Sequence, residues 1–245
     1  MKSWIADLAR QIIQRLPFRA RKALFSLVSG ATAAAGNRQA LVELFILHDI
    51  LESEIDRCAV RYGDGVHPKH HLMRYHDFFV SRVTPGETVL DIGCGRGMVA
   101  HSLAMAGAKV TGIDLNEDNI CAARERYQHP NLSFIIGDAT RALPSGSFKT
   151  VIASNVLEHI ENRIDFLNRV QQAIKPDRWL IRVPVLDRHW HTPLKQELGL
   201  SPSSDPTHYT EYTHASFMKE MDAAGLAIRH LDRIWGEIWA EVTHE

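Results

Sequence analysis

The chain has 245 residues, of which 45% are hydrophobic and 23% are charged. This composition is typical of a globular protein, and the length allows one α/β domain with a smaller appendage. The formal net charge is −1, so no overall basic field attracts the protein to nucleic acid. No apolar run in the sequence approaches the length of a membrane span.

Cysteine usage indicates the compartment. Cys58, Cys94 and Cys121 have spacings that fit neither a metal site nor a disulfide framework. Such cysteines favour a reducing environment, so we expect a cytoplasmic protein.

The first 62 residues show helical periodicity, with breaks at Pro17 and around Gly30 to Gly36. We therefore expect a helical extension over residues 1–65 and the main domain over residues 66–245. A long helix is predicted from about Arg38 to Tyr62.

The first helix of this extension is amphipathic. Its apolar stripe comprises Trp4, Ile5, Leu8, Ile12, Ile13 and Leu16. Basic residues surround the stripe and are opposed only by Asp7; they are Lys2, Arg10, Arg15, Arg19, Arg21 and Lys22. Such a helix can lie on an anionic membrane surface, which would make peripheral membrane contact. The alternative is a helix packed over the core or a partner subunit, and the pattern does not fix an oligomeric state.

The most informative stretch is Val89–Gly97, where a short apolar run is interrupted by Asp91 and followed by glycines at alternate positions. The run is typical of a buried parallel strand, and the glycines of a tight turn into a helix that begins near Arg96. Glycine is needed where the backbone passes close to a ligand and takes torsions that a Cβ forbids. The D-x-G-x-G order differs from the nicotinamide fingerprint, which lacks this Asp and requires a third glycine elsewhere.

Two further predicted strands also end in acidic residues. Lys109–Asp114 ends in Asp114, and Phe134–Ile136 is followed by Asp138. Ligands of open parallel sheets bind at the carboxyl ends of the strands, so acids at successive ends predict a binding site there. Taken singly, each acid could instead be a solvated carboxylate at the start of a loop.

These motifs, followed by a fourth strand and a V-L-E-H segment in Val151–Ile160, resemble the class I S-adenosylmethionine-dependent methyltransferases. The resemblance implies an α/β fold with a Rossmann-like seven-stranded sheet and S-adenosylmethionine as cofactor. It assigns Asp114 to the ribose hydroxyls and Asp138 or its neighbour to the adenine. The implied cofactor-binding residues are Asp91, Gly93, Cys94, Gly95, Asp114, Leu115, Asp138, Ala139 and Asn155.

In this family, the segment before the glycine strand borders the cofactor and substrate cleft. The resemblance places His67, His70, His71 and His76 there, although a solvated loop or a helix start after Pro68 are alternatives. The helix from Arg38 to Tyr62 is expected to cover the cofactor site.

The remaining elements complete the sheet. We predict a helix over Arg163–Ile174, a strand over Trp179–Val185, a helix over Ala215–Ala224 closed by Gly225, and an antiparallel pair over Ala227–Ile234 and Glu237–Val242. The segment Leu186–His214 is too long for a plain connection, and such a loop is usually functional.

The V-L-E-H segment and the long loop suggest the chemistry. Together they resemble the small-RNA 3′-terminal methyltransferases, in which E-x-x-E-H and H-x-x-E-W segments supply a divalent-metal site that binds a vicinal diol. Ubiquinone-pathway catechol methyltransferases are similar around the first segment. The resemblance implies Glu158, His159 and His208 as catalytic residues and as ligands of Mg²⁺ or Mn²⁺, with Asn155 in place of the first Glu.

Two alternatives to the metal remain. His159 could act as a general base without metal, since its ordinary pKa suits proton transfer near neutrality. The segment could also serve only to order the helix or contact the cofactor.

The loop also bears on the acceptor, because Trp190, His191, Tyr209 and Tyr212 suit stacking on a sugar or a flat ring. We expect O-methylation of a sugar or another hydroxylated small molecule, a small-molecule or glycan acceptor that could be lipid-linked. An RNA or lipid acceptor is the alternative. A catalytically silent S-adenosylmethionine-binding regulator and a nicotinamide oxidoreductase are further alternatives, disfavoured by the intact glycine turn and by the lack of a convincing Tyr-x-x-x-Lys motif.

Overall fold

The computed structural model describes residues 9, 11–203, 205 and 207–244. The first residues of the predicted amphipathic helix, including Lys2, Trp4, Ile5, Leu8 and Arg10, therefore lie outside the described residues. Residues 11–15 are helical, and Pro17 precedes the next helix as expected.

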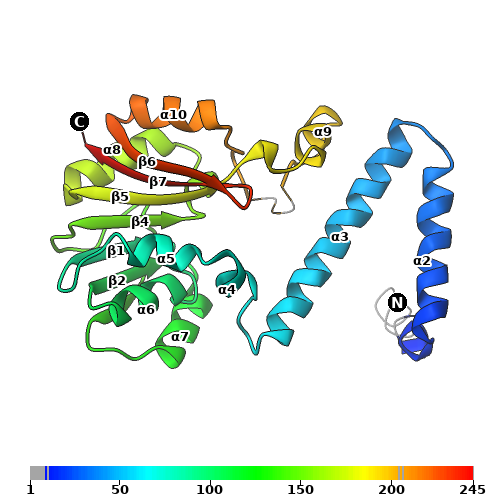
Figure 1. Ribbon diagram of the computed structural model, residues 1–245, viewed down its shortest axis with the longest axis horizontal. Coiled ribbons are helices and arrows are strands. Elements are labelled where there is room, and N and C mark those ends of the chain that lie inside the picture. Colours follow the sequence, from blue (N-terminus) through cyan, green and yellow to red (C-terminus); the bar gives the residue numbers. More distant parts are fainter. Residues whose placement is uncertain (1–8, 10, 204, 206, 245) are drawn as a thin grey trace.

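The chain forms one seven-stranded sheet with helices around it (Figure 1). Its strands are β1 (Thr88–Ile92), β2 (Lys109–Asp114), β3 (Leu132–Ile136), β4 (Thr150–Ser154), β5 (Arg178–Pro184), β6 (Leu226–Ile234) and β7 (Glu237–His244). The helices and turns are α2 (Phe18–Ala33), α3 (Arg38–Tyr62), α4 (Lys69–Met73), α5 (Tyr75–Val80), α6 (Met98–Met105), α7 (Glu117–Arg126), η1 (Leu157–His159), α8 (Arg163–Ile174), η2 (Leu186–Arg188), α9 (His191–Glu197) and α10 (His214–Ala223).

The strand order is β3-β2-β1-β4-β5-β7-β6, which confirms the predicted seven-stranded α/β sheet. Strands β1 to β5 are parallel, and β7 pairs antiparallel with both β5 and β6. The chain runs outward from β1 to β3 and then returns to the other side of β1 with β4. This reversal separates the loops that follow β1 and β4, and such a switch point is where open α/β sheets bind ligands.

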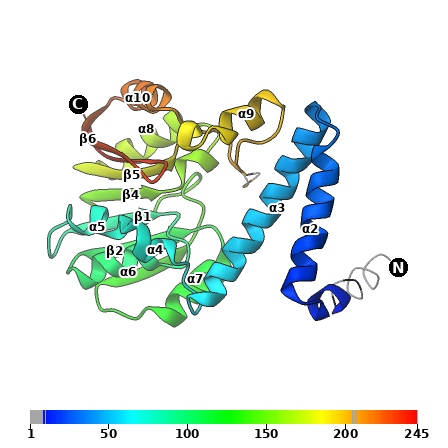
Figure 2. The same cartoon turned by 45° about the vertical axis from the view of Figure 1, so that its right-hand side comes forward.

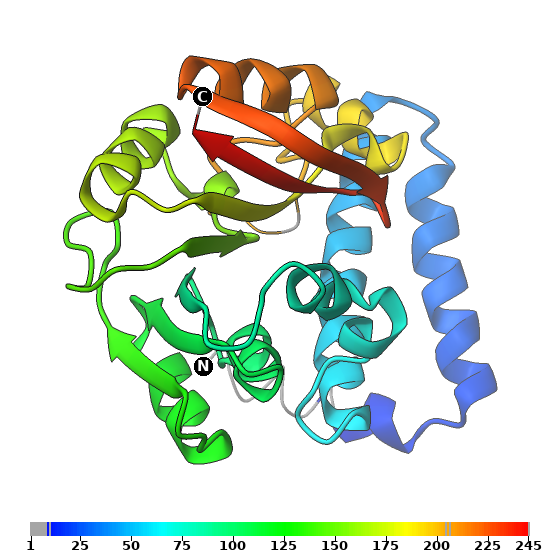
Figure 3. The ribbon, with the colours of Figure 1, turned by 60° about the vertical axis from the view of Figure 1, so that its left-hand side comes forward.

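Each face of the sheet carries its own core because side chains alternate along every strand. Leu90 and Ile92 of β1 pack with residues of α8 and α10, whereas Val89 packs with residues of α5, α6 and α7. Helices therefore cover both faces, as a parallel sheet requires. Figure 3 shows α10 above the antiparallel strands and the N-terminal helices to one side.

One observed helix start differs slightly from the prediction. The helix expected near Arg96 begins at Met98, because Gly97 before it has a φ of 78° and cannot be its first helical residue. The break expected around Gly30 to Gly36 is found within that range, since α2 ends at Ala33 and the chain turns at Gly36 before α3 begins.

The N-terminal segment forms a two-helix hairpin. Helix α3 lies between α2 and the rest of the protein in both Figures 1 and 2. It buries Ala40 and Phe45, whereas no residue of α2 is buried. Contacts from α3 reach the long loop, where Lys195 of α9 lies 2.9 Å from both carboxylate oxygens of Asp49.

Candidate active site

The glycine turn after β1 is held by the neighbouring strand. The amides of Gly93 and Cys94 both donate to the carbonyl of Ile113, at 2.8 and 3.1 Å. Gly93 has a φ of 65°, and a Cβ there would lie 2.6 Å from a methyl carbon of Val156. The position therefore requires glycine for its torsion and for its close approach to the loop after β4.

Asp91 is the acidic residue of this turn, and it is fully buried on the sheet face that α6 covers. Its Oδ2 has no hydrogen-bond partner within the described residues. Burial, with a smaller contribution from the charge of Asp114, raises its pKa to about 7. A buried carboxylate oxygen without a partner is costly, so the site suits a ligand that brings a positive charge.

Asp114 ends β2 and ties the turn to that strand. One of its carboxylate oxygens accepts from the amide of Gly95 and the other from the amide of Asn116, both at 2.8 Å. The side-chain amide of Asn119 also donates to the second oxygen, at 3.4 Å, so the remaining acceptor capacity of Asp114 for a ligand hydroxyl is at the oxygen that Gly95 contacts.

Two cavities at this edge of the sheet contain all the predicted cofactor residues. A cavity of about 500 Å³ is lined by Asp91, Cys94 and Gly95, and one of about 280 Å³ by Asp114, Leu115, Asp138 and Ala139. Gly93 and Asn155 line both. A glycine cradle, a ribose-type acid and an unpaired buried carboxylate thus fit S-adenosylmethionine, with its hydroxyls and its cationic end.

Helix α3 also reaches the larger of these two cavities, as the predicted cover of the cofactor site requires. Asp56 and Val60 of α3 are among the residues that line this cavity.

Arg182 of β5, a residue not predicted from the sequence as part of the site, lines the same cavity. Its guanidinium binds both carboxylate oxygens of Glu237 at 2.5 and 2.6 Å and lies 3.8 Å from the centre of the Tyr75 ring. A single arginine inside an otherwise apolar parallel strand was the available signal, because such a charge is almost never buried without a partner.

Only some of the histidines predicted to border the cleft before β1 lie at the cofactor cavity. His67 and His70 line the cofactor cavity, whereas His71 does not. His70 contacts the hydroxyl of Tyr75 and the ring of His76, whose other nitrogen lies 2.7 Å from the Ser102 hydroxyl. Burial lowers the pKa of His70 to about 3 and that of His76 to about 4, so this network is neutral.

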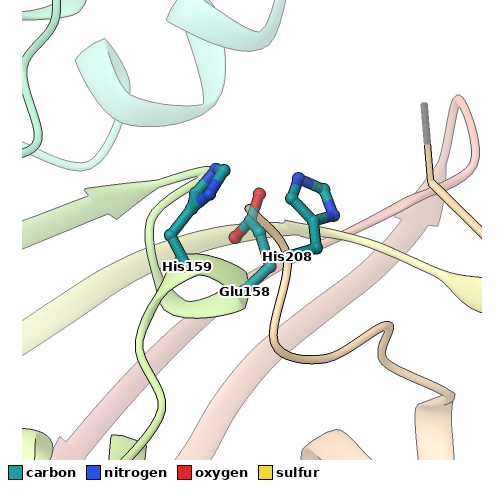
Figure 4. Close-up of side chains that lie close together, drawn as sticks. All are labelled: Glu158, His159 and His208. Atoms are coloured by element: carbon teal, nitrogen blue, oxygen red, sulfur yellow. The ribbon is translucent and has the colours of Figure 1, made fainter. Parts of the chain in front are cut away.

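The loop after β4 and the long loop bring Glu158, His159 and His208 together (Figure 4). One ligand atom from each of the three lies within 4.8 Å of the others. The two imidazole rings contact each other edge to face, with centroids 4.6 Å apart, and Figure 4 shows the Glu158 carboxylate beside them. Backbone hydrogen bonds join the two loops: the amides of Tyr209 and Thr210 donate to the carbonyl of Glu158, at 2.8 and 3.4 Å.

Glu158 is the buried member of this cluster, and neither of its carboxylate oxygens has a partner in the described part of the chain. Burial raises its pKa to about 7. Glu158 is thus a second buried carboxylate, after Asp91, without a hydrogen-bond partner among the described residues.

The two histidines are oriented by hydrogen bonds at Nδ1. His159 Nδ1 lies 2.8 Å from the Thr207 hydroxyl, and His208 Nδ1 lies 2.7 Å from a carboxylate oxygen of Glu211. These contacts leave Nε2 of each ring for another partner. Burial and the nearby His208 lower the pKa of His159. Burial alone would lower the pKa of His208, but the bond to Glu211 and the charges of Glu158 and Glu211 raise it.

A third cavity, of about 770 Å³, opens beside this cluster. Glu158, His159 and His208 line one side, and residues of α3, η2 and α9 line the other; these include His48, Asp49, Glu52, Arg188, His191 and Lys195. Asn155 lines this cavity and both cofactor cavities. It has a φ of 55°, uncommon for a residue with a side chain, and its amide oxygen is buried without a partner among the described residues.

Comparison with known proteins identifies the class. Residues 66–231 match the family model described as a methyltransferase domain. The chain therefore belongs to this methyltransferase domain family.

Curated relatives include two ubiquinone biosynthesis O-methyltransferases. The chain is 31% identical to that of Hydrogenovibrio crunogenus over 132 residues, which are 50% of this chain and 54% of the relative. It is 33% identical to that of Albidiferax ferrireducens over 120 residues, 46% of this chain and 48% of the relative. The chain thus spans about half the length of the curated relatives it matches.

Solved structures show the same fold. Magnesium protoporphyrin IX methyltransferase from Synechocystis, with bound SAH, superposes with a TM-score of 0.57 and 23% identity over 70% of this chain and 83% of that chain. Mitomycin 7-O-methyltransferase superposes with a TM-score of 0.58 and 18% identity over 75% of this chain and 56% of that chain. At these identities the likeness concerns the fold alone.

Proposed function

We propose that the protein transfers the methyl group of S-adenosylmethionine to a hydroxyl oxygen of a sugar or a similar hydroxylated small molecule. The observation that carries this proposal is the position of Asn155, where the acceptor-sized cavity of about 770 Å³ meets the cofactor cavities beside Glu158 and His159. An acceptor there would lie next to the transferred methyl group and to groups able to handle a hydroxyl proton. The curated relatives are O-methyltransferases, which supports transfer of the methyl group to oxygen.

The lining of the acceptor cavity favours a hydroxylated molecule. Carboxylates and imidazoles surround it, and they can accept or donate hydrogen bonds to several hydroxyl groups. Among the described lining residues, the apolar side chains are Pro184, Pro202 and Trp235. The exposed indole of Trp235 offers a flat surface against which a sugar ring can pack.

We further propose that Glu158, His159 and His208 hold Mg²⁺ or Mn²⁺. Glu158 has two unpaired carboxylate oxygens, and each histidine has an Nε2 not engaged by the contacts at Nδ1. A mixed set of imidazole and carboxylate ligands fits Mn²⁺ better than Mg²⁺, because Mg²⁺ prefers oxygen ligands. Thr207 and Glu211 would orient the two rings. When bound, the metal would lower the pKa of an acceptor hydroxyl and fix two of its oxygens.

The competing mechanism uses no metal. In it His159, neutral because burial lowers its pKa, accepts the hydroxyl proton as a general base, and Glu158 orients the acceptor. Both mechanisms place the acceptor in the same cavity, so they differ in whether the cluster binds a cation.

Calorimetric titration of the EDTA-treated protein with Mn²⁺ tests the metal proposal. We expect one ion per chain, with binding at least about tenfold weaker in Glu158→Gln because a charged ligand is lost. Glu52→Gln is the matched control, since Glu52 belongs to a second, more exposed group with His48 and Asp49. If the Glu158→Gln variant and the unmodified protein bind Mn²⁺ with equal affinity, the metal proposal is wrong and the metal-free mechanism remains.

Transfer to oxygen is tested with S-adenosylmethionine that carries a labelled methyl group and a panel of monosaccharides, nucleotide sugars, catechols, amines and thiols. We expect label in an ether, and about a hundredfold less of it with His208→Ala at unchanged S-adenosylhomocysteine affinity. Label found only on amine or thiol acceptors would contradict the proposal.

A further inference from the structure

The hairpin of α2 and α3 carries an apolar surface that no other described residue covers. Phe18 and Leu27 of α2 are 71% and 70% exposed, and Leu24, Phe25 and Val28 are also exposed. Ala20, Ala23, Leu24, Leu27 and Ala31 recur at helical spacing, so they share one side of α2. Helix α2 packs on α3 and has no buried residue, so it does not pack over the core of the sheet.

The charge of this part of the chain is one-sided. Between Leu8 and Val42 the sequence has no Asp or Glu, and its basic residues are Arg10, Arg15, Arg19, Arg21, Lys22 and Arg38. The net charge of the whole protein is −1, so the remainder is net acidic. Arg15, Arg19, Arg21 and Lys22 are exposed, and none of them forms an ion pair with another described residue.

We propose that α2, with the helical turn before it, docks the protein on an anionic lipid bilayer. Exposed apolar side chains among unpaired basic ones are what an interfacial helix needs, because the apolar groups enter the headgroup region while the cations meet the phosphates. Within the described part of the chain, no helix combines the length and the apolar character that crossing a membrane requires, so the contact is peripheral.

Charge selects the bilayer over the other plausible occupant, a second copy of the chain. A symmetric contact between two α2 helices would bring the same basic residues together without an acid on either helix. An anionic surface attracts these residues instead, contributing about a fivefold increase in binding for each one near the headgroups.

The position of α2 is compatible with an accessible active site. In Figures 1 and 2, α2 lies on the far side of α3 from the sheet. His48, Asp49 and Glu52 of α3 face the acceptor cavity, so the docking helix and the cavity are on opposite sides of α3. A bilayer against α2 would hold the acceptor cavity near the membrane without covering it.

Co-sedimentation of the full chain with lipid vesicles tests the proposal. We expect binding to vesicles of phosphatidylcholine with phosphatidylglycerol, little binding to phosphatidylcholine alone, and weaker binding at high salt. The triple variant Arg19→Gln/Arg21→Gln/Lys22→Gln should lose at least about tenfold in binding, and Leu27→Asp should reduce it as well. The matched control is Lys109→Gln/Lys149→Gln/Lys175→Gln, which removes the same charge from exposed residues at the amino-terminal edge of the sheet.

Equal loss of vesicle binding in the control triple variant, or failure of the unmodified protein to bind anionic vesicles, would overturn the proposal. A stable dimer in light scattering that Leu27→Asp dissociates would also overturn it, because the apolar face would then be a subunit interface. S-adenosylhomocysteine affinity, measured on every variant, reports folding and the cofactor site separately from lipid binding.

Discussion

The buried carboxylate of Asp91 destabilises the folded protein by itself, but it can strengthen the binding of a positively charged ligand. The carboxylate is fully buried, and one of its oxygens lacks a partner within the described residues. Its raised pKa records the cost of ionising it there. A ligand with an ammonium or sulfonium group would supply the missing charge.

The first prediction is that S-adenosylhomocysteine binds more tightly as the pH rises from about 5.5 to 7.5. Below a pKa of about 7 Asp91 is protonated and offers no charge to the ligand, whereas above it the ionised form attracts the ligand's ammonium. Asp91→Asn should weaken binding about tenfold or more at pH 7.5 and remove this pH dependence. Calorimetry across the pH range measures both effects, with Asp118→Asn on the exposed face of α7 as control.

Asp91 has the opposite effect on the pH dependence of stability, which we expect to fall as ligand affinity rises. Because the folded-state pKa of Asp91 lies above its ordinary value of 3.8, the folded protein binds more protons, and stability falls as the pH rises from about 4 to 7. Asp91→Asn should therefore be at least as stable as the unmodified ligand-free protein at pH 8 while binding the cofactor less well. A variant that both unfolds earlier and keeps its affinity would contradict this role.

At the scale of elements, the acceptor cavity depends on the docking of α3 against α9. Lys195 is buried, with 5% of its surface exposed, and its ammonium is held by Asp49 of α3. Arg38 at the start of α3 also donates to the carbonyl of Leu198 at 2.5 Å. These contacts join two segments about 150 residues apart and form one wall of the cavity.

The second prediction is that Asp49→Asn loosens this wall. Loss of the carboxylate would leave the buried Lys195 charge without its partner, at a cost of about 1–2 kcal/mol once the partial exposure of Asp49 is considered. Amide hydrogen exchange in α3 should become faster while cofactor affinity is unchanged. Glu54→Gln, which breaks an exposed pair with Arg57, should leave exchange unchanged; equal effects of both substitutions would show that Lys195 does not hold the wall.

At the scale of the whole molecule, the hairpin and the sheet contribute unequally to stability. The buried core lies on the two faces of the sheet, and α2 adds no buried residue to it. Helix α3, in contrast, contributes Ala40 and Phe45 and lines two of the cavities. The division into residues 1–65 and 66–245 stays a prediction, which truncation can test.

The third prediction is that deletion of residues 1–36 changes the free energy of unfolding by less than about 1 kcal/mol, because little apolar area is lost from the core. Cofactor affinity should also be retained. Deletion of residues 1–65 should instead weaken binding, since Asp56 and Val60 line the cofactor cavity. Denaturant unfolding and calorimetry of both truncations provide the test, and a large loss of stability in the shorter one would show that α2 supports the core.

The strands, the glycine turn and the acids at the strand ends could all be predicted from the order of the amino acids. These features depend on local chemistry: a period of two along a strand, and a backbone at Gly93 that accepts no Cβ. The exact first and last residues of helices are harder to predict from sequence. Helix α6, for example, begins at Met98, although the sequence pattern alone also allows a start at Gly97.

Which distant residues meet is known only from the three-dimensional arrangement of the chain. The fold brings His208 to Glu158 and His159, pairs Arg182 with Glu237, places α3 against α9 and leaves the outer side of α2 uncovered by other described residues. Such contacts depend on strand register and on how a long loop folds back, and neither leaves a periodic signal in the sequence. The cofactor residues could be predicted because they follow successive strands of one sheet edge, whereas the acceptor cavity required the packing of segments from both ends of the chain.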